Sequence, residues 1–501
     1  MTRRELLLGL PGLGLAARLP TVAAARNLPN ILYILCDDLG WSDSTLYGTT
    51  KLYETPNIEK LAARGVLFTQ AYSAGPMCSP TRGSIMSGLW PERTGLTEAN
   101  GHVEEVRLKA EPRASSAPWQ RYVLPLPATR MDTAYYTMGK AFRDAGYRTA
   151  HFGKWHLGRE PYDPLHQGFT SDIPHSYQCC QPGRYLAPWK WAEGVTYDTG
   201  SPGEYVDDRM ANEAIRFMTE NRNETFYCNV WFYATHGGPQ TTPELREKYR
   251  KKIETLPADY PQRNPETAGL VELLDRAVGK LMRAVDDLGI ADRTIIVFFS
   301  DNGGWCWPSG QPMPMTSNAP LRSGKSSVYE GGTRVPLAFI WPGRTKPGSR
   351  TDAIFNSLDS YPTLLAMAGL KPKPGVKLDG INQVPAILDK GAPRDTNFCF
   401  VPYPGRDYAG PGAWVRKGDW KLIRFFCGNP DQSDRFELYN LRADIGETKD
   451  LAKQQPRILA ELSALLEKHF EQTHAVLPIK NPKYDPKAKP PQQTAMLLSP
   501  E

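Results

Sequence analysis

The sequence predicts an α/β fold in which helices flank a large, mostly parallel central sheet. Two apolar runs, at 31–36 and 294–300, are too short for helices and have the continuous hydrophobic character of strands buried on both faces. Helical patterns alternate with these and other strand-like runs, an order typical of a parallel sheet. Both apolar runs end in acidic or amide residues, at the edge of the sheet where such folds bind ligands.

The other elements can be assigned in chain order. A helix begins at Thr55, which can cap it, and ends before Gly65, and an extended segment starts at Val66. The alternation continues with helix 133–145, strand 149–155, helix 206–221, strand 226–233 and helix 267–288. The pattern then changes to short β-like runs at 397–401 and 414–426 and a helix at 457–470. This change predicts a smaller C-terminal α+β subdomain.

The chain is expected to have four parts. Its start combines Arg3 and Arg4, a short apolar stretch and small residues, the pattern of a secretory signal peptide of the twin-arginine type. The alternatives are an uncleaved anchor and a cytoplasmic terminus. We therefore expect a periplasmic or secreted protein that uses the twin-arginine export machinery. The predicted parts are a signal peptide at 1–25, a catalytic domain at 26–390, the C-terminal subdomain at 391–477 and a loosely ordered tail at 478–501.

The composition allows a large core and excludes several classes of protein. Of the 501 residues, 40% are hydrophobic and 23% charged, which is ordinary for a globular chain and unlike a disordered or fibrous one. The net charge is only +6, and basic residues do not cluster, so we expect no nucleic-acid partner. No apolar run reaches the roughly 18 residues of a spanning helix, so we expect no stable membrane insertion. The eight cysteines contain no C-x-x-C pair, which leaves a zinc ribbon unsupported.

The segment 78–83 has the features of an anion-binding helix start. Pro80 suits the first turn of a helix, so Cys78 would lie at the N-terminus, where free amides favour a negative charge. Arg82 follows four residues later and would share the same helix face. This arrangement suits attack on an oxyanion or its binding. A small buried cysteine with Arg82 at the surface is the alternative.

Oxygen donors follow the two apolar strands. Asp37 and Asp38 come directly after the first strand, and Asp301 and Asn302 after the second. Neighbouring strand ends can bring these side chains around one cation. An all-oxygen set of carboxylates and an amide selects calcium or magnesium, and its flexibility favours calcium. Four polar residues that merely cap strands are the alternative.

Four basic residues complete the candidate site. Lys154 and His156 stand two apart on a strand-like segment, so their side chains are expected on one face, where they could neutralise an anion and move a proton. His236 follows another strand, and Lys325 lies in a loop rich in Gly and Ser. Each of these residues alone would be an ordinary structural or exposed side chain.

Taken in order, these segments resemble the type I, formylglycine-dependent sulfatases of the alkaline-phosphatase-like superfamily. Residues 78–82 are similar to the Cys-x-Pro-x-Arg signature of that family. The resemblance runs from about residue 28 to 452 and continues through other segments. These are 29–41, 153–158, the looser match at 235–237, 300–303, 322–325 with 330–332, 359–363 and 438–441.

The resemblance implies hydrolysis of a sulfate monoester. Cys78 would be converted to formylglycine by a formylglycine-generating enzyme, and the hydrated aldehyde would be the nucleophile. A calcium ion would be the second cofactor. Its implied ligands are Asp37, Asp38, Asp301 and Asn302.

The resemblance also implies a role for each remaining catalytic residue. Arg82 would steady the hydrate, and Lys154 and Lys325 would bind the sulfate and offset the developing charge. His236, alone or with Lys325, would protonate the leaving alcohol. His156 would help to deprotonate the second hydroxyl, so that sulfate leaves and the aldehyde returns.

A sulfated polysaccharide or oligosaccharide is the expected substrate of an exported enzyme of this kind. Segments 102–130 and 159–205 are expected to line the mouth of the pocket, and their tryptophans could stack on sugar rings. The alternatives are small aromatic sulfates, phosphonate or phosphate esters cleaved through formylglycine, and a binding protein without catalysis. The candidate substrate contacts are His102, Asp172, His175, Arg184 and Arg322.

Overall fold

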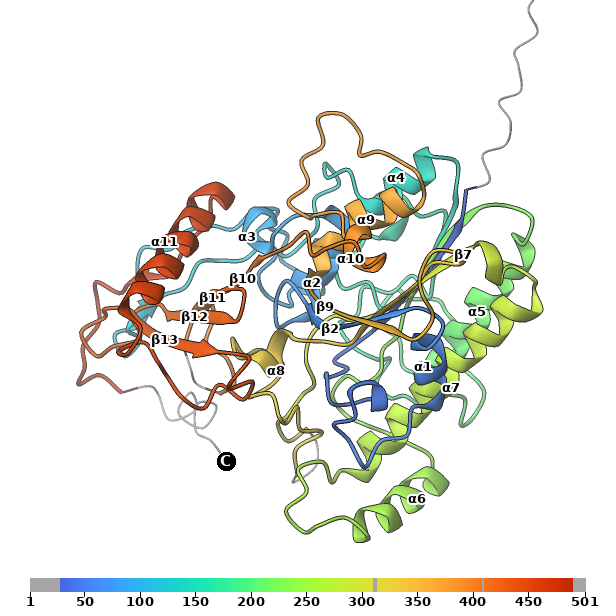
Figure 1. Cartoon of the computed structure of the whole chain (residues 1–501), viewed down its shortest axis with the longest axis horizontal. Helices are drawn as coiled ribbons and strands as arrows, with labels where there is room; N and C mark the ends of the chain where they lie inside the picture. Colours follow the sequence, from blue (N-terminus) through green and yellow to red (C-terminus); the bar gives the residue numbers. More distant parts are fainter. Residues whose placement is uncertain (1–27, 310–312, 408–409, 490–501) are drawn as a thin grey trace, which may run out of the picture.

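The computed structural model describes residues 28–309, 313–407 and 410–489. The predicted signal peptide at 1–25 and the last residues of the tail, 490–501, lie outside the described residues. Among the residues that the structure describes, no helix combines the length and hydrophobicity needed to cross a membrane. Two large sheets and the helices around them make up most of the described structure (Figure 1).

An eight-stranded sheet forms the centre of the larger part, with the strand order β5-β4-β6-β1-β7-β8-β2-β9. Only β8 is antiparallel to its neighbours β7 and β2, and the other pairs are parallel, which confirms the predicted mostly parallel sheet. In chain order the strands are β1 (Asn30–Cys36), β2 (Val66–Tyr72), β4 (Arg148–Gly153), β5 (Ser171–Ile173), β6 (Phe226–Trp231), β7 (Thr294–Ser300), β8 (Leu337–Ile340) and β9 (Ser349–Asn356).

Strand β1 shows why helices cover both faces of this sheet. Its side chains alternate between two apolar clusters, with Leu32 and Ile34 in one and Tyr33 and Leu35 in the other. The first cluster includes apolar residues of α1 (Pro56–Ala62), α5 (Val206–Glu220) and α7 (Pro265–Asp287). The second includes residues of α2 (Cys78–Ser87), α4 (Met138–Asp144), α9 (Ser360–Met367) and α10 (Val384–Ile387). Helix α6 (Pro243–Glu254) packs against α7.

Two predicted boundaries are wrong. The helix predicted at 133–145 begins only at Met138, because Thr137 caps it by accepting a hydrogen bond from the amide of Lys140 at 3.2 Å. The strand predicted at 149–155 ends at Gly153, where φ is +102° and a Cβ atom would lie 2.1 Å from the carbonyl oxygen of Trp231. Lys154 and His156 therefore lie in an irregular loop after this strand and not on a strand face.

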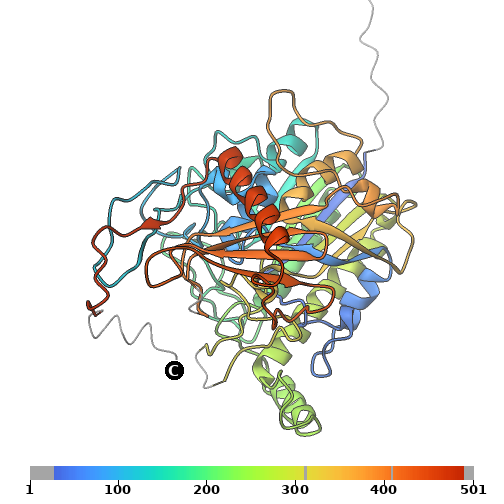
Figure 2. The same ribbon diagram turned by 60° about the vertical axis from the view of Figure 1, so that its left-hand side comes forward.

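A second, antiparallel sheet follows in the C-terminal part. It contains β10 (Thr396–Val401), β11 (Gly412–Lys417), β12 (Trp420–Phe425) and β13 (Arg435–Asn440). Helix α11 (Pro456–Thr473) covers one face of it (Figure 2). The other face packs against Val328, Tyr329 and the end of β2. Part of the predicted tail forms β14 (Ile479–Lys480), which pairs with β3 (Tyr122–Val123).

Two short helices and four 3-10 turns are the remaining described elements. Helix α3 (Pro91–Thr94) follows α2, and α8 (Glu330–Thr333) lies between the two sheets. Four 3-10 turns lie at Thr45–Tyr47, Pro164–Gln167, Ala291–Arg293 and Ser357–Asp359. The larger sheet and α2 supply the framework on which the candidate residues are arranged.

Candidate active site

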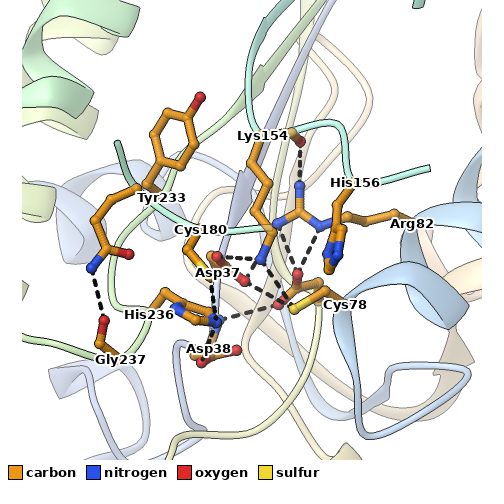
Figure 3. Close-up of polar contacts among 12 residues, drawn as sticks. Asp37, Asp38, Cys78, Arg82, Lys154, His156, Cys180, Tyr233, His236 and Gly237 are labelled. Carbon is orange, nitrogen blue, oxygen red and sulfur yellow. Dashed lines mark hydrogen bonds and ion pairs between the residues drawn. The ribbon is translucent and has the colours of Figure 1, made fainter. Parts of the chain in front are cut away.

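Four neighbouring parallel strands, β4, β6, β1 and β7, end at one edge of the central sheet. Asp37 directly follows β1, Asp301 follows β7 and Lys154 follows β4, while His236 lies five residues beyond β6. Cys78 starts α2 beside this edge. Figure 3 shows the resulting cluster, in which residues far apart in the sequence point toward one another. The catalytic and metal-binding candidates of the sequence therefore lie together in space.

Oxygen atoms gather tightly in this cluster. The side chains of Asp37, Asp38, Cys78 and Asp301 are buried and offer atoms that all lie within 4.8 Å of one another. The amide nitrogen of Asn302 donates to Asp38 at 2.7 Å, whereas its Oδ1 atom is buried with no hydrogen-bond partner among the described residues. Because a buried acceptor without a donor is costly, this oxygen suits a cation.

Each carboxylate of the cluster faces a cationic side chain. Lys154 Nζ lies 2.6 Å from Asp37 Oδ2, and Lys325 Nζ lies 2.7 Å from Asp38 Oδ1. Burial raises the pKa of Asp37 to about 8, against the opposing effect of Lys154. Burial would also raise the pKa of Asp38, but Lys325 and other nearby cations hold it well below its usual range. The site therefore holds aspartate and lysine side chains next to one another, away from water.

Arg82 holds the carboxylates from the side of α2. Its Nη2 atom lies 2.7 Å from Asp301 Oδ2 and 3.6 Å from Asp37 Oδ1, and Nη1 donates to the carbonyl of Lys154. The guanidinium also lies over the ring of Trp231, 5.3 Å from its centre. Arg82 is completely buried, so the alternative of a surface arginine is wrong.

Cys78 occupies the centre of the cationic side chains. Its Sγ atom lies 3.1 Å from Lys154 Nζ, 3.5 Å from Lys325 Nζ and 3.4 Å from Asp37 Oδ1. Burial, followed by the charge of Asp37, raises the pKa of the Cys78 thiol well above its ordinary value. An unmodified cysteine here would stay protonated and would be a poor nucleophile.

Two histidines flank this centre. His156 has φ of +57°, a left-handed conformation that is strained for a residue other than glycine. His236 Nε2 lies 4.0 Å from Asp38 Oδ2. Burial and the neighbouring lysines lower the pKa of both histidines well below the ordinary value. Both Nδ1 atoms lack hydrogen-bond partners among the described residues, so each ring has a free nitrogen that could exchange a proton.

The candidate substrate contacts lie in different surroundings. His102 Nδ1 is 2.9 Å from His156 Nε2, so His102 joins the site. Asp172 and His175 pair with each other at 2.7 Å and line a cavity of about 200 Å³. Arg184 is exposed. Arg322 is engaged elsewhere, because it stacks on Tyr329 and donates to the carbonyl of Glu447 at 2.9 Å. The contact of these side chains with substrate stays a prediction.

The sequence interpretation missed one residue at the site. Cys180 was not among the candidates from the sequence, but its Sγ atom lies 3.9 Å from His236 Nε2 (Figure 3). Adjacent cysteines in a loop carry no pattern that indicates such a contact. The loop reaches the site through tertiary packing, with the Gln181 side chain donating to the carbonyl of Gly237 at 2.8 Å.

Comparisons with known proteins identify relatives of this chain. The family model "Sulfatase" matches residues 29–370, and the model "N-sulphoglucosamine sulphohydrolase, C-terminal" matches residues 323–475. A "Sulfatase" of Formosa agariphila is 31% identical, covering 90% of this chain and 89% of the relative. The "N-acetylgalactosamine-6-sulfatase" of Canis lupus familiaris is 31% identical, covering 77% and 70%. The crystal structure of "Ps i-CgsB in complex with k-i-k-neocarrahexaose" has a TM-score of 0.70 and 26% identity, covering 94% of this chain and 96% of that chain.

Proposed function

This chain belongs to the sulfatase family, and we propose that it releases inorganic sulfate from a sulfated carbohydrate through a formylglycine derived from Cys78. One observation carries the proposal: the Cys78 sulfur lies between two lysine side chains and the buried carboxylates at the ends of β1 and β7. Support for a carbohydrate comes from the sugar sulfatase among the relatives and the oligosaccharide bound to the similar crystal structure.

The oxygen cluster fits the divalent metal that this family uses. Asp37, Asp38, Asp301 and Asn302 would hold calcium, and the buried Asn302 Oδ1 atom would gain the partner that it lacks among the described residues. The ion would polarise the sulfate oxygens and lower the pKa of the attacking hydroxyl. The side chain of Arg82 would keep Asp37 and Asp301 in place beside it.

The lysines account for the binding of sulfate. A hydrated formylglycine would supply one hydroxyl that attacks sulfur and a second that drives sulfate release as the aldehyde returns. Lys154 and Lys325 already donate toward the Cys78 sulfur, so both would meet the oxygens of a sulfate group bound there. Fixed cations in a buried site stabilise developing negative charge more than cations in water do.

The two histidines would move the protons. His236 would give a proton to the leaving alcohol, and the Asp38 carboxylate, 4.0 Å from its Nε2 atom, favours the protonated form against the opposing effects of burial and Lys325 on its pKa. Lys325 is the second candidate donor. His156 is neutral and its Nδ1 atom is free, so it would take the proton of the second hydroxyl.

Parallel assays would test the reaction class. We expect turnover of 4-nitrophenyl sulfate, and faster turnover of sulfated galactosamine or sulfated galactan oligosaccharides, with little release from 4-nitrophenyl phosphate or phenylphosphonate. Asn302 supports this choice, because two-metal phosphoesterases of the same fold commonly need histidine ligands. Faster phosphate or phosphonate turnover would replace the sulfatase proposal with its closest rival.

Cys78 itself can be tested by mass spectrometry and substitution. The peptide carrying Cys78, taken from active protein, should have the mass of an aldehyde in place of the thiol. Cys78→Ala should abolish turnover, whereas Cys228→Ala, at a buried cysteine inside β6, should retain it. An unmodified thiol in fully active protein would exclude the formylglycine mechanism.

Two partners would act on this chain before catalysis. We propose that a formylglycine-generating enzyme modifies Cys78 and that the twin-arginine machinery exports the protein to the periplasm or beyond. Replacing Arg3 and Arg4 with lysine should leave the full chain in the cytoplasm, as followed by cell fractionation. Unchanged export would point to a different route.

A further inference from the structure

His102 and His156 form a pair of imidazoles at the rim of the site. The Nδ1 atom of His102 lies 2.9 Å from the Nε2 atom of His156, and the two ring centres are 5.1 Å apart. His156 is buried, whereas His102 is exposed. Resting on the function proposed above, we propose that His102 is a positioning residue that fixes the tautomer of His156, so that His156 Nδ1 is free to accept a proton.

The backbone keeps His156 in one place. Its left-handed conformation, with φ of +57°, is held by Ser79, whose hydroxyl donates to the carbonyl of His156 at 2.7 Å. Ser79 directly follows Cys78, so this bond ties His156 to the helix start that carries the nucleophile. The amide of Met131 donates to the carbonyl of Leu157, the next residue, at 2.9 Å. Strain of this kind persists only where surrounding contacts determine the conformation.

The loop that carries His102 is fixed against the same backbone. A Cβ atom added to Gly101 would lie 1.9 Å from the carbonyl oxygen of His156, so the loop packs there without room for a side chain. The buried guanidinium of Arg130 donates to the carbonyls of Gly101 at 3.4 Å and Thr129 at 2.7 Å, and also to Val103. His102 is therefore presented to His156 by a rigid segment, although its own side chain is exposed.

The hydrogen bond between the rings determines which nitrogen of His156 can act as a base. Two neutral imidazoles can share only one N–H between them. If His156 carries its proton on Nε2, it donates to His102, and its Nδ1 atom, which has no partner among the described residues, keeps its lone pair. The Nε2–H bond to His102 also survives when Nδ1 is protonated, so it stabilises the imidazolium.

This role resembles that of an orienting carboxylate in a catalytic triad, with a neutral acceptor in its place. The proton moves from the second hydroxyl to His156 Nδ1, the O–H electron pair forms the aldehyde C=O bond, and the C–O bond to sulfate breaks. Water then adds to the aldehyde and supplies both hydrogens of the restored hydrate, while the proton on His156 Nδ1 leaves to solvent with the released sulfate. His156 therefore ends each cycle in its starting tautomer. His102 neither gains nor loses a proton during the cycle.

Kinetics of two variants separate positioning from substrate contact. His102→Phe fills the space but accepts no hydrogen bond, and we expect kcat to fall about 10- to 100-fold with KM nearly unchanged. His102→Gln supplies an amide oxygen that can accept from His156 Nε2, and it should recover most of the lost kcat. His166→Phe is the control, because His166 is a partly exposed histidine bonded to Asp163.

Nitrogen NMR of the histidine side chains gives a readout that does not depend on turnover. In full-length Cys78→Ala protein we expect His156 to carry its proton on Nε2, and in the added presence of His102→Phe we expect that preference to be lost. The signal would be assigned by its disappearance in His156→Gln. A wild-type His156 protonated on Nδ1 would overturn the proposal.

The kinetic outcomes are equally decisive. A raised KM with unchanged kcat in His102→Phe would make His102 a substrate contact and overturn the positioning role, as would kcat within twofold of wild type. If the wild-type protein hydrolyses no sulfate ester, the proposed function is wrong. The tautomer measured in Cys78→Ala protein still decides the role of His102 in that case.

Discussion

The molecule has two networks of buried charges, one around Cys78 and one between the two sheets, and only one of them has the features of an active site. The first is the site network around Cys78, described above. The second, here called the anchor network, joins the C-terminal sheet to the central one. It consists of Tyr72, Glu330, Arg334, Arg416, Lys421 and Glu447.

The anchor network is as buried and as charged as the site network. Lys421 Nζ lies 3.0 Å from Glu330 Oε1 and 2.8 Å from Glu447 Oε1. The second oxygen of Glu330 accepts from the Tyr72 hydroxyl at 2.7 Å, and the second oxygen of Glu447 accepts from the Glu330 amide at 2.7 Å. Each carboxylate oxygen of this pair therefore has a partner. Burial raises the pKa of Glu447 to about 7, so a raised carboxyl pKa is found here as well as in the site.

Only some features distinguish the site network from the anchor network. Strong pKa shifts and complete burial occur in both networks, and left-handed backbone occurs at Asp38 and at Glu447, so none of these distinguishes them. The difference lies in unpartnered atoms: within the described residues, Asn302 Oδ1 and the Nδ1 atoms of His156 and His236 have neither a hydrogen bond nor an ion pair. In the anchor network, Glu447 Oε1 also lacks a hydrogen bond but lies 2.8 Å from the cation of Lys421. A binding site keeps such unpaired polar atoms for its ligand, whereas a structural network pairs its polar atoms within the protein.

The largest expected effect is on turnover in the site network. Lys154→Met keeps the length of the side chain but removes the charge beside Cys78, and we expect the hydrolysis rate to fall at least about 10³-fold. The free energy of unfolding should stay the same or rise, because Asp37 can become neutral and functional sites are often destabilising. Initial rates and urea unfolding would be measured beside Lys60→Met, at an exposed lysine. Loss of stability matching the loss of activity would erase the distinction between the networks.

The next effect is on stability in the anchor network. Lys421→Met leaves two buried glutamates without their shared cation, and we expect about 3–5 kcal/mol loss in the free energy of unfolding. The folded fraction should retain its kcat. Adding Glu447→Gln to the same chain should return part of the stability, because Glu330 keeps Arg334 as its partner and no carboxylate is then left without a cation. A specific loss of kcat in folded protein would mean that the anchor network acts on catalysis.

A smaller effect concerns pH. The pKa of Glu447 is raised from 4.5 to about 7 in the folded protein, so the folded state retains a proton that the unfolded chain releases between these values. The contribution of Glu447 to stability is therefore fully present below about pH 4.5 and declines as the pH rises to about 7. Glu447→Gln should remove this decline, a difference on the order of 1–3 kcal/mol between unfolding curves at pH 4.5 and 7. Glu461→Gln, at an exposed position of α11, should leave it unchanged.

The smallest effect is expected at the surface. Arg64 and Asp286 form a two-point ion pair with distances of 3.0 and 2.9 Å, but both side chains are substantially exposed. Arg64→Ala should lower the free energy of unfolding by less than about 1 kcal/mol, and less still in high salt. A loss as large as that of Lys421→Met would show that burial does not separate the strong pairs from the weak ones here.

Much of the central sheet and of the site was predictable, because local patterns determined both. The apolar runs that became β1 and β7 had to be buried strands, and parallel strands end at one edge, so Asp37 and Asp301 were expected to meet. The position of Cys78 at the start of α2 followed from Pro80 in the same way. These inferences used contacts between a residue and its own strand or helix.

The remaining features depend on contacts that no local pattern contains. The strand before Lys154 ends early because Gly153 packs on Trp231, and His102 meets His156 because Arg130 holds its loop. Cys180 reaches His236 through a similarly irregular loop. Such positions are set by tertiary packing, which overrides the periodicity of the sequence.

The complete burial of α2 constrains when Cys78 could be modified relative to folding. All ten residues of the helix are buried, and Cys78 is only 1% exposed. An enzyme that is to convert Cys78 would need it in an extended, accessible segment, so conversion would have to precede the docking of α2 under the central sheet. A molecule that folds first would lock in an unreactive thiol, which makes the timing of synthesis and folding, and not only the finished geometry, a determinant of how many molecules become active.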